Sequence, residues 1–250
     1  MKTIVSFVAA IAAFGFADCA QATPPAPFSW TGFYVGATAG FARTKADVNL
    51  DTVNGALPLY FTSQIPGLNA IGSPSISGWN AIFGGKLGYN QQWGSFVLGL
   101  EGDISSFRFN QSGMTTGNPF DIVLPPATPN VANFNTSVST RWLATVRPRL
   151  GYAVDQTLFY ATAGLAFAKV DFSNTYQGHS PLGAGDEFEA TSASQTKTGW
   201  AAGAGIDYAL APNWIVSVEY LHADLGTIAA SGLLTTGDAN TATMNFSTKV

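Results

Sequence analysis

The sequence predicts an all-β fold, namely an eight-stranded antiparallel up-and-down transmembrane β-barrel whose last strand is incomplete. Three observations predict it: the composition, an apolar/polar alternation with a period of two, and connections that are alternately long and short. Charged residues make up 10% of the chain and hydrophobic residues 46%, whereas an ordinary soluble domain has about 25% charged residues. After the N-terminus there is no run of about 18 apolar residues, so a membrane-spanning helix has no candidate. The apolar residues therefore either fill a large core or alternate onto one face of β-strands.

Two-faced strands recur along the chain. In residues 144–152, Val146, Leu150 and Tyr152 alternate with Arg147 and Arg149. A soluble sandwich would crowd its polar face with Lys, Glu and Thr, whereas here that face is mostly Gly, Ala and a few opposite charges. Small residues suit the inside of a narrow barrel, whose bore is filled by side chains. The apolar face is then expected to contact lipid.

The first expected element is a secretory signal peptide at residues 1–22. It has a positive charge at Lys2, an apolar region from Ile4 to Ala17, and small residues at Ala20-Gln21-Ala22 that predict cleavage before Thr23.

The mature chain is expected to consist of a periplasmic lead-in at residues 23–29 and a membrane β-barrel at residues 30–250. The lead-in is proline-rich and therefore stiff and extended. Cys19 is the only cysteine of the chain. It leaves with the signal peptide, so neither a disulfide nor thiol chemistry is expected.

The barrel strands and their connections follow in order. Strands are expected at about 30–46, 78–92, 95–107, 138–153, 157–171, 196–210 and 213–226, with a last strand beginning near residue 242. Tight turns are expected around Trp93-Gly94, Asp155-Gln156 and Ala211-Pro212. Long connections rich in Gly, Pro, Asn, Ser and Thr are expected at 47–77, 108–137, 172–195 and 227–241. Short periplasmic turns and longer external loops are typical of transmembrane barrels, so the long connections are the expected contact sites for external partners.

Charged side chains are expected inside the barrel. The expected interior charges are Glu101, Asp103, Arg147, Arg149, Asp207 and Glu219. Because a buried charge is tolerated only when it is paired and hydrogen-bonded, these residues are expected to pair across the bore. They form either a salt-bridged plug or the lining of a narrow polar path. With Arg141 as a third cation the carboxylates remain in excess, so any pore would favour cations.

Aromatic residues and one proline complete the pattern. Aromatic girdles are expected from Trp30, Tyr89, Trp142, Tyr152, Trp214 and Tyr220. Pro148 cannot donate to a strand ladder and a closed barrel has no free edge, so a local bulge is expected there.

Four sequence blocks carry a family resemblance. They are "WTGFYVGATAGFA", "GGKLGYNQQWGSFVLGLEGD", "VRPRLGYAVDQTLFYATAGLAFA" and "TGWAAGAGIDYALAPNWIVSVEYLHADLG". In this order they resemble the strand motifs of the small outer-membrane immunogenic, or porin-family, β-barrel proteins of Gram-negative bacteria, relatives of the OmpA/OmpX-type barrels. The resemblance covers roughly residues 28 to 226. It implies an eight-stranded barrel in the cell outer membrane and a surface-antigen role, and implies transport less firmly.

The C-terminal end departs from that family. Chains of the family end in a strand that closes with an aromatic residue, whereas this chain stops at "TATMNFSTKV". Residues 242–250 are therefore expected to be the first part of a truncated last strand, with Met244 and Phe246 beginning its lipid-facing side.

Few residues suggest chemistry. No nucleic-acid partner is expected, because the net charge is -4 and no Lys/Arg run occurs. No metal or cofactor is expected, because His179 and His222 are the only histidines and a metal or catalytic histidine needs partners at ligand or triad distance. The expected partners are outer-membrane lipid and external molecules. The leading function is a structural and interaction protein of the outer membrane, and the alternative is a narrow, weakly cation-selective small-solute porin. A lipid-modifying enzyme that uses His222 with a serine is a third, less favoured class.

Overall fold

The described part of the chain forms ten strands and one short helix. The computed structural model describes residues 9–14, 28–56, 60, 62–119, 131–179, 186–235 and 241–249. Its elements are β1 (Ala9–Phe14), β2 (Gly32–Asn54), α1 (Ile65–Ile71), β3 (Ser75–Trp93), β4 (Phe96–Gly117), β5 (Ala132–Val154), β6 (Thr157–His179), β7 (Asp186–Ala211), β8 (Trp214–Asp224), β9 (Thr227–Thr235) and β10 (Thr241–Lys249). The all-β antiparallel prediction is confirmed. The predicted count of eight strands is not, because the sheet contains ten.

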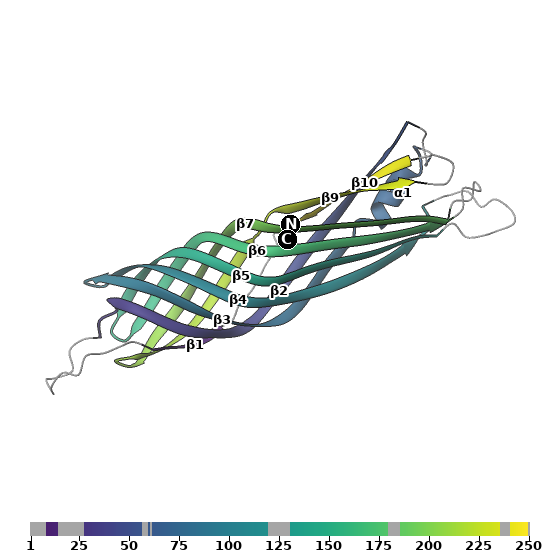
Figure 1. The fold of residues 1–250 in the computed structure, drawn as a ribbon. Helices are drawn as coiled ribbons and strands as arrows, with labels where there is room; N and C mark the ends of the chain where they lie inside the picture. Colours follow the sequence, from purple (N-terminus) through teal and green to yellow (C-terminus); the bar gives the residue numbers. More distant parts are fainter. Residues whose placement is uncertain are drawn as a thin grey trace.

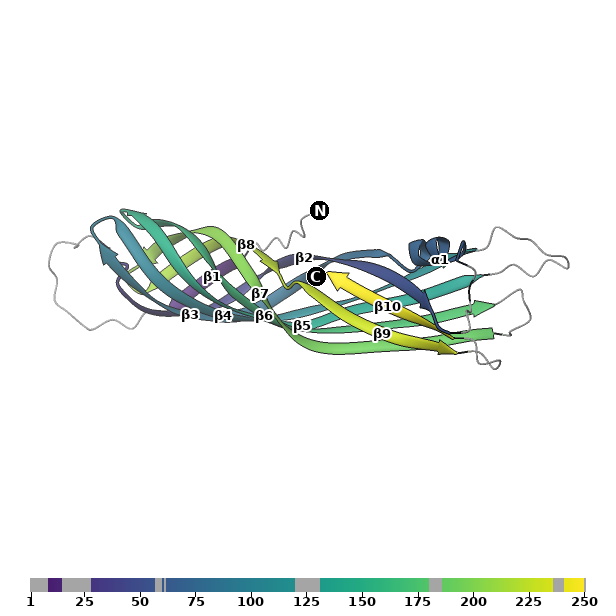
Figure 2. The same cartoon turned by 90° about the horizontal axis from the view of Figure 1, so that it is seen from above.

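The sheet curls into an elongated tube (Figure 1). The strand order is β1-β8-β7-β6-β5-β4-β3-β2-β10-β9. In the half of the tube that adjoins the tight turns, called here the short-turn half, β1 pairs with both β8 and β2. In the opposite half, called the far half, β10 pairs with β2 and β9, and β9 lies beside β7. Figure 2 shows β10 ending near the middle of the tube.

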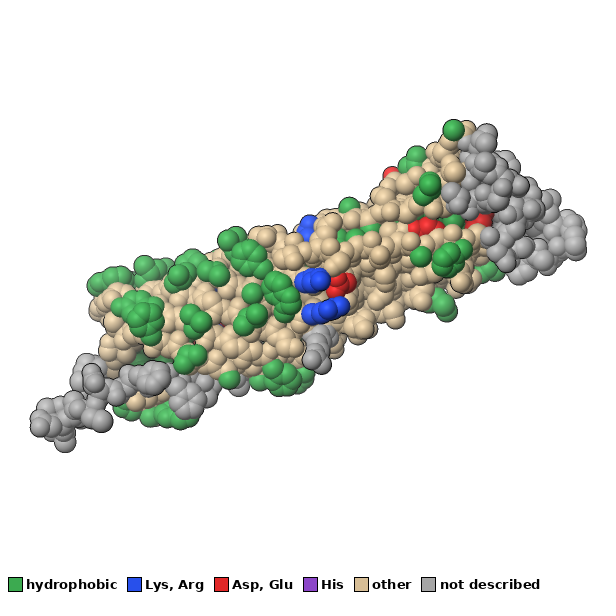
Figure 3. Space-filling view, in the orientation of Figure 1, with side chains coloured by type: hydrophobic (Ala, Val, Ile, Leu, Met, Phe, Trp, Pro, Cys, Tyr) green, Lys and Arg blue, Asp and Glu red, His purple; other side chains and the backbone are tan. Residues whose placement is uncertain are grey.

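An apolar belt covers the outside of the short-turn half. Many side chains that point outward from β2 to β8 are large, apolar and exposed, and Figure 3 shows one face of this belt. They include Phe33, Leu87, Leu100, Leu150, Phe159 and Val218. In the described part of the chain, no helix is long and apolar enough to cross a membrane.

The far half has the opposite arrangement. Its outward side chains are mostly Ser, Thr and Asn, and its interior is a hydrophobic core that includes Leu50, Phe109, Phe134, Val138, Phe172 and Leu234. Met244 and Phe246 also point into this core and are 0% and 2% exposed. The prediction that they face lipid was therefore wrong. The reason is that β10 pairs with the Asp47–Asn54 end of β2, which lies in the half with the apolar interior.

The predicted long connections are largely strand. For example, β5 begins at Ala132 and β6 ends at His179, so both strands extend well into segments expected to be loops. The polar residues that suggested loops alternate with buried ones, as Asn133 and Asn135 do with Phe134. They form the outer face of a strand. Helix α1 lies in the connection between β2 and β3, and its Leu68 is fully buried.

The tight turns form where the sequence predicts them. Gly94 and Asp155 have φ values of 59° and 52° in the turns that end β3 and β5. Glycine reaches this left-handed region without strain, and aspartate tolerates it better than most residues. The third turn, between Ala211 and Trp214, joins β7 to β8.

The bulge of β5 does not lie at Pro148. Pairing between β5 and β6 is interrupted there but resumes in the same register, and the register shifts between Thr140 and Leu143. A bulge places two consecutive residues on one side of a strand. Here Arg141 and Trp142 both lie on the outside. The residues that point inward are therefore even-numbered up to Thr140 and odd-numbered from Leu143.

Two N-terminal features differ from expectation. Residues Ala9–Phe14 of the predicted signal peptide form β1, while the predicted cleavage site before Thr23 lies outside the described residues. Trp30 does not belong to an outer aromatic girdle, because it points inward and is 4% exposed. Tyr89, Tyr152, Trp214 and Tyr220 are exposed on the outside as expected, and Trp142 is half-buried there.

Candidate functional site: the buried charge network

The six predicted interior charges lie inside the short-turn half. They come from four strands: Glu101 and Asp103 from β4, Arg147 and Arg149 from β5, Asp207 from β7, and Glu219 from β8. Each occupies the inward position of its strand, while apolar neighbours on either side point outward into the belt.

Arg147 holds three carboxylates together. Its Nη2 lies 3.0 Å from both Glu101 Oε1 and Asp103 Oδ2, and its Nη1 pairs with Glu219. The Thr145 hydroxyl donates a further hydrogen bond to Asp103. Arg147 and Glu101 are 2% and 1% exposed. The guanidinium group therefore joins carboxylates from β4 and β8 across the bore.

Arg149 makes a second set of contacts. Its Nη2 pairs with Asp207, and its Nη1 lies 3.3 Å from Glu101 Oε2 and donates to the Tyr34 hydroxyl at 3.0 Å. The guanidinium carbon also stacks 3.8 Å from the centre of the Tyr160 ring. Cation–π contacts of this kind are strongest when the groups are desolvated. The two arginines share Glu101, so the pairs form one network.

Lys86 is the third cation of the network. Its Nζ lies 3.3 Å from Glu101 Oε2, and its side chain is 3% exposed. The expected third cation, Arg141, lies instead on the outside with its side chain 74% exposed, paired with Asp171 at 3.7 Å. The sequence pattern also indicates that Lys86 points inward, because Lys86 stands next to the apolar Leu87 as the other interior charges stand next to apolar residues. With Lys86 included, four carboxylates face three cations.

Buried apolar side chains lie in the bore on both sides of the network. Toward the tight turns, Trp30 packs with Val97, Ala153, Leu158 and Ala209. Toward the other end, the hydrophobic core of the far half begins. The charges therefore lie between two groups of buried apolar side chains.

A smaller polar group lies within the core of the far half. Glu187 Oε2 accepts hydrogen bonds from the hydroxyls of Tyr60 and Tyr176 at 2.7 and 3.1 Å. Burial raises the pKa of both tyrosines above the ordinary value. Glu189, also on β7, is 3% exposed, and burial raises its pKa to about 7.

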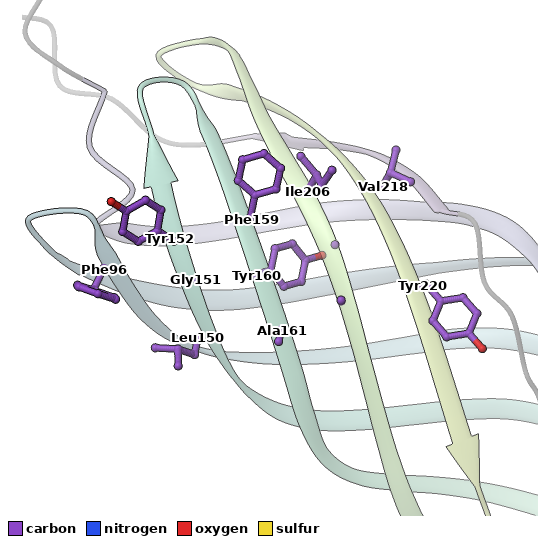
Figure 4. Close-up of a pocket in the computed structure, with 12 residues that line it drawn as sticks. Phe96, Leu150, Gly151, Tyr152, Phe159, Tyr160, Ala161, Ile206, Val218 and Tyr220 are labelled. Carbon is purple, nitrogen blue, oxygen red and sulfur yellow. The ribbon is translucent and has the colours of Figure 1, made fainter.

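A shallow apolar groove crosses the outside of the belt. It has a volume of about 650 Å³ and lies over β5 to β8. In Figure 4 the rings of Tyr152, Phe159 and Tyr220 stand around its small residues, such as Ala161. Among the lining residues, Tyr152, Tyr160 and Tyr220 carry the titratable groups, and the remaining side chains are apolar or absent.

The structure places His222, the residue that suggested lipid-modifying chemistry, on the outer surface. His222 lies on the outside of β8, with its ring centre 5.2 Å from that of Trp200. Among the described residues, no three His, Cys, Asp or Glu side chains are grouped so as to hold a metal ion.

Comparisons with known proteins give consistent similarities. A family model described as an outer membrane protein beta-barrel domain matches residues 6–250. The 31 kDa outer-membrane immunogenic protein of Brucella melitensis is 33% identical over 221 residues, which cover 84% of this chain and 80% of the relative. The 25 kDa outer-membrane immunogenic protein of Brucella abortus is 25% identical over 240 residues, 90% of this chain and 85% of the relative. The crystal structure of Ail, the attachment invasion locus protein of Yersinia pestis, matches 84% of this chain and 95% of Ail with a TM-score of 0.29 and 13% identity.

Proposed function

The chain belongs to the outer membrane protein β-barrel domain family, and we propose that it acts in the outer membrane as a structural and interaction protein with a surface-antigen role. In this proposal the short-turn half is the membrane anchor. The far half is an extension that presents its connections to external partners.

The succession of buried groups along the bore is the observation that carries this proposal. A conducting barrel needs a continuous polar path, as in the water-filled lumen of porins. Here a Trp30 layer, an ion-pair layer and a hydrophobic core succeed one another along the axis. A barrel with ion pairs and apolar side chains along its bore suits an anchor better than a channel.

The length of the strands supports an external role. A membrane-spanning β-strand needs about 9–11 residues, whereas β5 has 23 residues and β7 has 26. The residues beyond this membrane-spanning length form the far half, whose outer face is polar. The two Brucella relatives are named immunogenic proteins, which agrees with exposure of such a surface.

The orientation can be tested with two epitope insertions. An epitope placed between His179 and Asp186, in the connection from β6 to β7 at the far end, should bind antibody on intact cells. The matched insertion at the Asp155-Gln156 turn should bind only after the outer membrane is permeabilised. Labelling of the turn on intact cells would show that the orientation is reversed.

The alternative is a narrow, weakly cation-selective porin. It is favoured by one observation, the excess of one carboxylate over the three cations of the network. Planar-bilayer recordings of the folded protein should show no stepwise conductance if the bore is a plug. Cation-selective steps that change in Glu219→Gln would establish the porin and overturn the proposal.

A further inference from the structure

A second groove lies where the apolar belt meets the polar surface. It has a volume of about 790 Å³ on the outside of β3, β4 and β5. Phe83 and Ile104 line its membrane side and are 63% and 58% exposed. Asn110 and Ser139 line its polar side. The groove therefore offers an apolar surface and a polar surface to one ligand.

Facing irregularities in two strands build this groove. The β4–β5 register shifts between Ser106 and Phe109, and the β5–β6 register shifts between Thr140 and Leu143. Because of the bulge, Arg141 and the neighbouring Trp142 both lie on the outside and line the groove. A regular strand would send one of the two into the interior.

Basic charge gathers at the same place. Lys169 lies on the outer face of β6, opposite the bulge, because Val170 pairs with Thr140 and Ala168 pairs with Leu143. Arg141 is highly exposed, and its 3.7 Å contact with Asp171 leaves most of the guanidinium group available. Figure 3 shows basic side chains gathered where the belt ends.

We propose that this groove binds a membrane lipid that carries an anionic phosphate headgroup. Its acyl chain lies on Phe83, Ile104 and Trp142, and its phosphate contacts Arg141 and Lys169. Arginine binds phosphate through paired N–H donors, and tryptophan is enriched at the headgroup level of membranes. In the orientation proposed above, the lipid belongs to the external leaflet.

Lipid retention measured by native mass spectrometry tests the site. The folded barrel in detergent is mixed with dioleoyl phosphatidic acid or with dioleoyl phosphatidylcholine, which has the same chains but no net charge. The wild type should retain phosphatidic acid preferentially. Arg141→Gln should weaken that retention about tenfold, as expected when charge-assisted hydrogen bonds are lost. Lys169→Gln should weaken it in the same direction, and Trp142→Ala should weaken retention of both lipids.

Arg43→Gln is the matched control, because Arg43 is an exposed arginine on β2 that does not line the groove. It should leave retention unchanged, and every variant should keep the heat-modifiable gel mobility of a folded barrel. Equal losses in Arg43→Gln and Arg141→Gln would show a general basic belt and overturn the site. Displacement of the lipid by equimolar inorganic phosphate would show a free-anion site instead.

Discussion

Arg141 and Arg147 lie on the same strand but in opposite environments. Arg147 is 2% exposed and contacts three carboxylates, whereas the side chain of Arg141 is 74% exposed and contacts one. The bulge between Thr140 and Leu143 separates them. Comparing substitutions of these two arginines therefore tests how much burial of the ion pairs contributes to the stability of the barrel.

Replacing Arg147 should destabilise the barrel strongly. Arg147→Ala leaves the inward side chains of Glu101, Asp103 and Glu219 with less compensation, and breaking a buried ion pair in this way costs about 3–5 kcal/mol. The urea midpoint for loss of the heat-modifiable compact form should fall accordingly. Arg141→Ala should cost less than about 1 kcal/mol, since exposed pairs contribute little. Similar midpoints for the two variants would mean that the network does not stabilise the fold.

Glu189 should make the stability of the barrel depend on pH. Its pKa in the folded chain is raised from 4.5 to about 7 by burial in the far half. The folded state therefore holds the proton more tightly than the unfolded chain does. The stability that protonated Glu189 contributes is fully present below the pKa of Glu189 in the unfolded chain. It is lost as the pH rises through the pKa of Glu189 in the folded chain.

Glu189→Gln should remove this dependence, because glutamine stays neutral. The measurement compares unfolding midpoints at about pH 5 and about pH 8, on either side of the titration. The wild type should lose more stability between these values than the variant. An identical loss in both proteins would rule out Glu189 as the titrating group.

At the scale of the element, β5 changes its pattern along its length. In the far half its outward residues are polar, such as Ser137, and its inward residues are apolar, such as Val138. In the short-turn half the outward Val146 is 49% exposed and apolar, and the inward neighbour is Arg147. The outer face of β5 thus changes from polar to apolar along the strand, and its inner face changes from apolar to charged. Both changes occur at the bulge.

A charge on the outer face of β5 should therefore have a position-dependent effect. Val146→Arg places a charge in the apolar belt, where the cost near the bilayer midplane is about 2–4 kcal/mol. Ser137→Arg places the same charge on the polar outer face of the far half and should be close to neutral. Folding into lipid vesicles, followed by heat-modifiable mobility across a urea series, measures the difference. Equal tolerance of both substitutions would mean that the belt does not lie in the membrane.

At the scale of the whole molecule, the N-terminal strand occupies a particular place. Strand β1 lies between β8 and β2, paired antiparallel to both. In the far half, β10 runs between β9 and β2 in the same way. The two strands therefore take equivalent positions in the two halves of the tube.

We expect β1 to be absent from the mature protein, because Ala9–Phe14 lies within the predicted signal peptide. The intact mass of protein extracted from outer membranes should correspond to a chain that begins at Thr23. A mass that includes residues 9–14 would instead make β1 a permanent strand of the barrel.

The short-range features of this protein are readable from its sequence. The inward positions of Arg147 and Arg149 and the three tight turns follow from alternation and turn chemistry, which depend on neighbouring residues only. The same alternation in "GGKLGYN" marks Lys86 as an inward residue. Local pattern thus determines which side of its strand a residue occupies.

Only the tertiary structure decided what each side of a strand faces. Trp30 and Met244 are apolar residues that the sequence places equally well on a lipid-facing surface, yet both are buried inside the tube. The register of β10 against β2 puts Met244 in the half whose interior is apolar. Period-two alternation assigns each residue to one of two faces, but it does not say whether an apolar face contacts lipid or packs inside the tube. The position of a segment along the tube is set by pairing between strands far apart in the chain, so the environment of each face is a property of the assembled barrel.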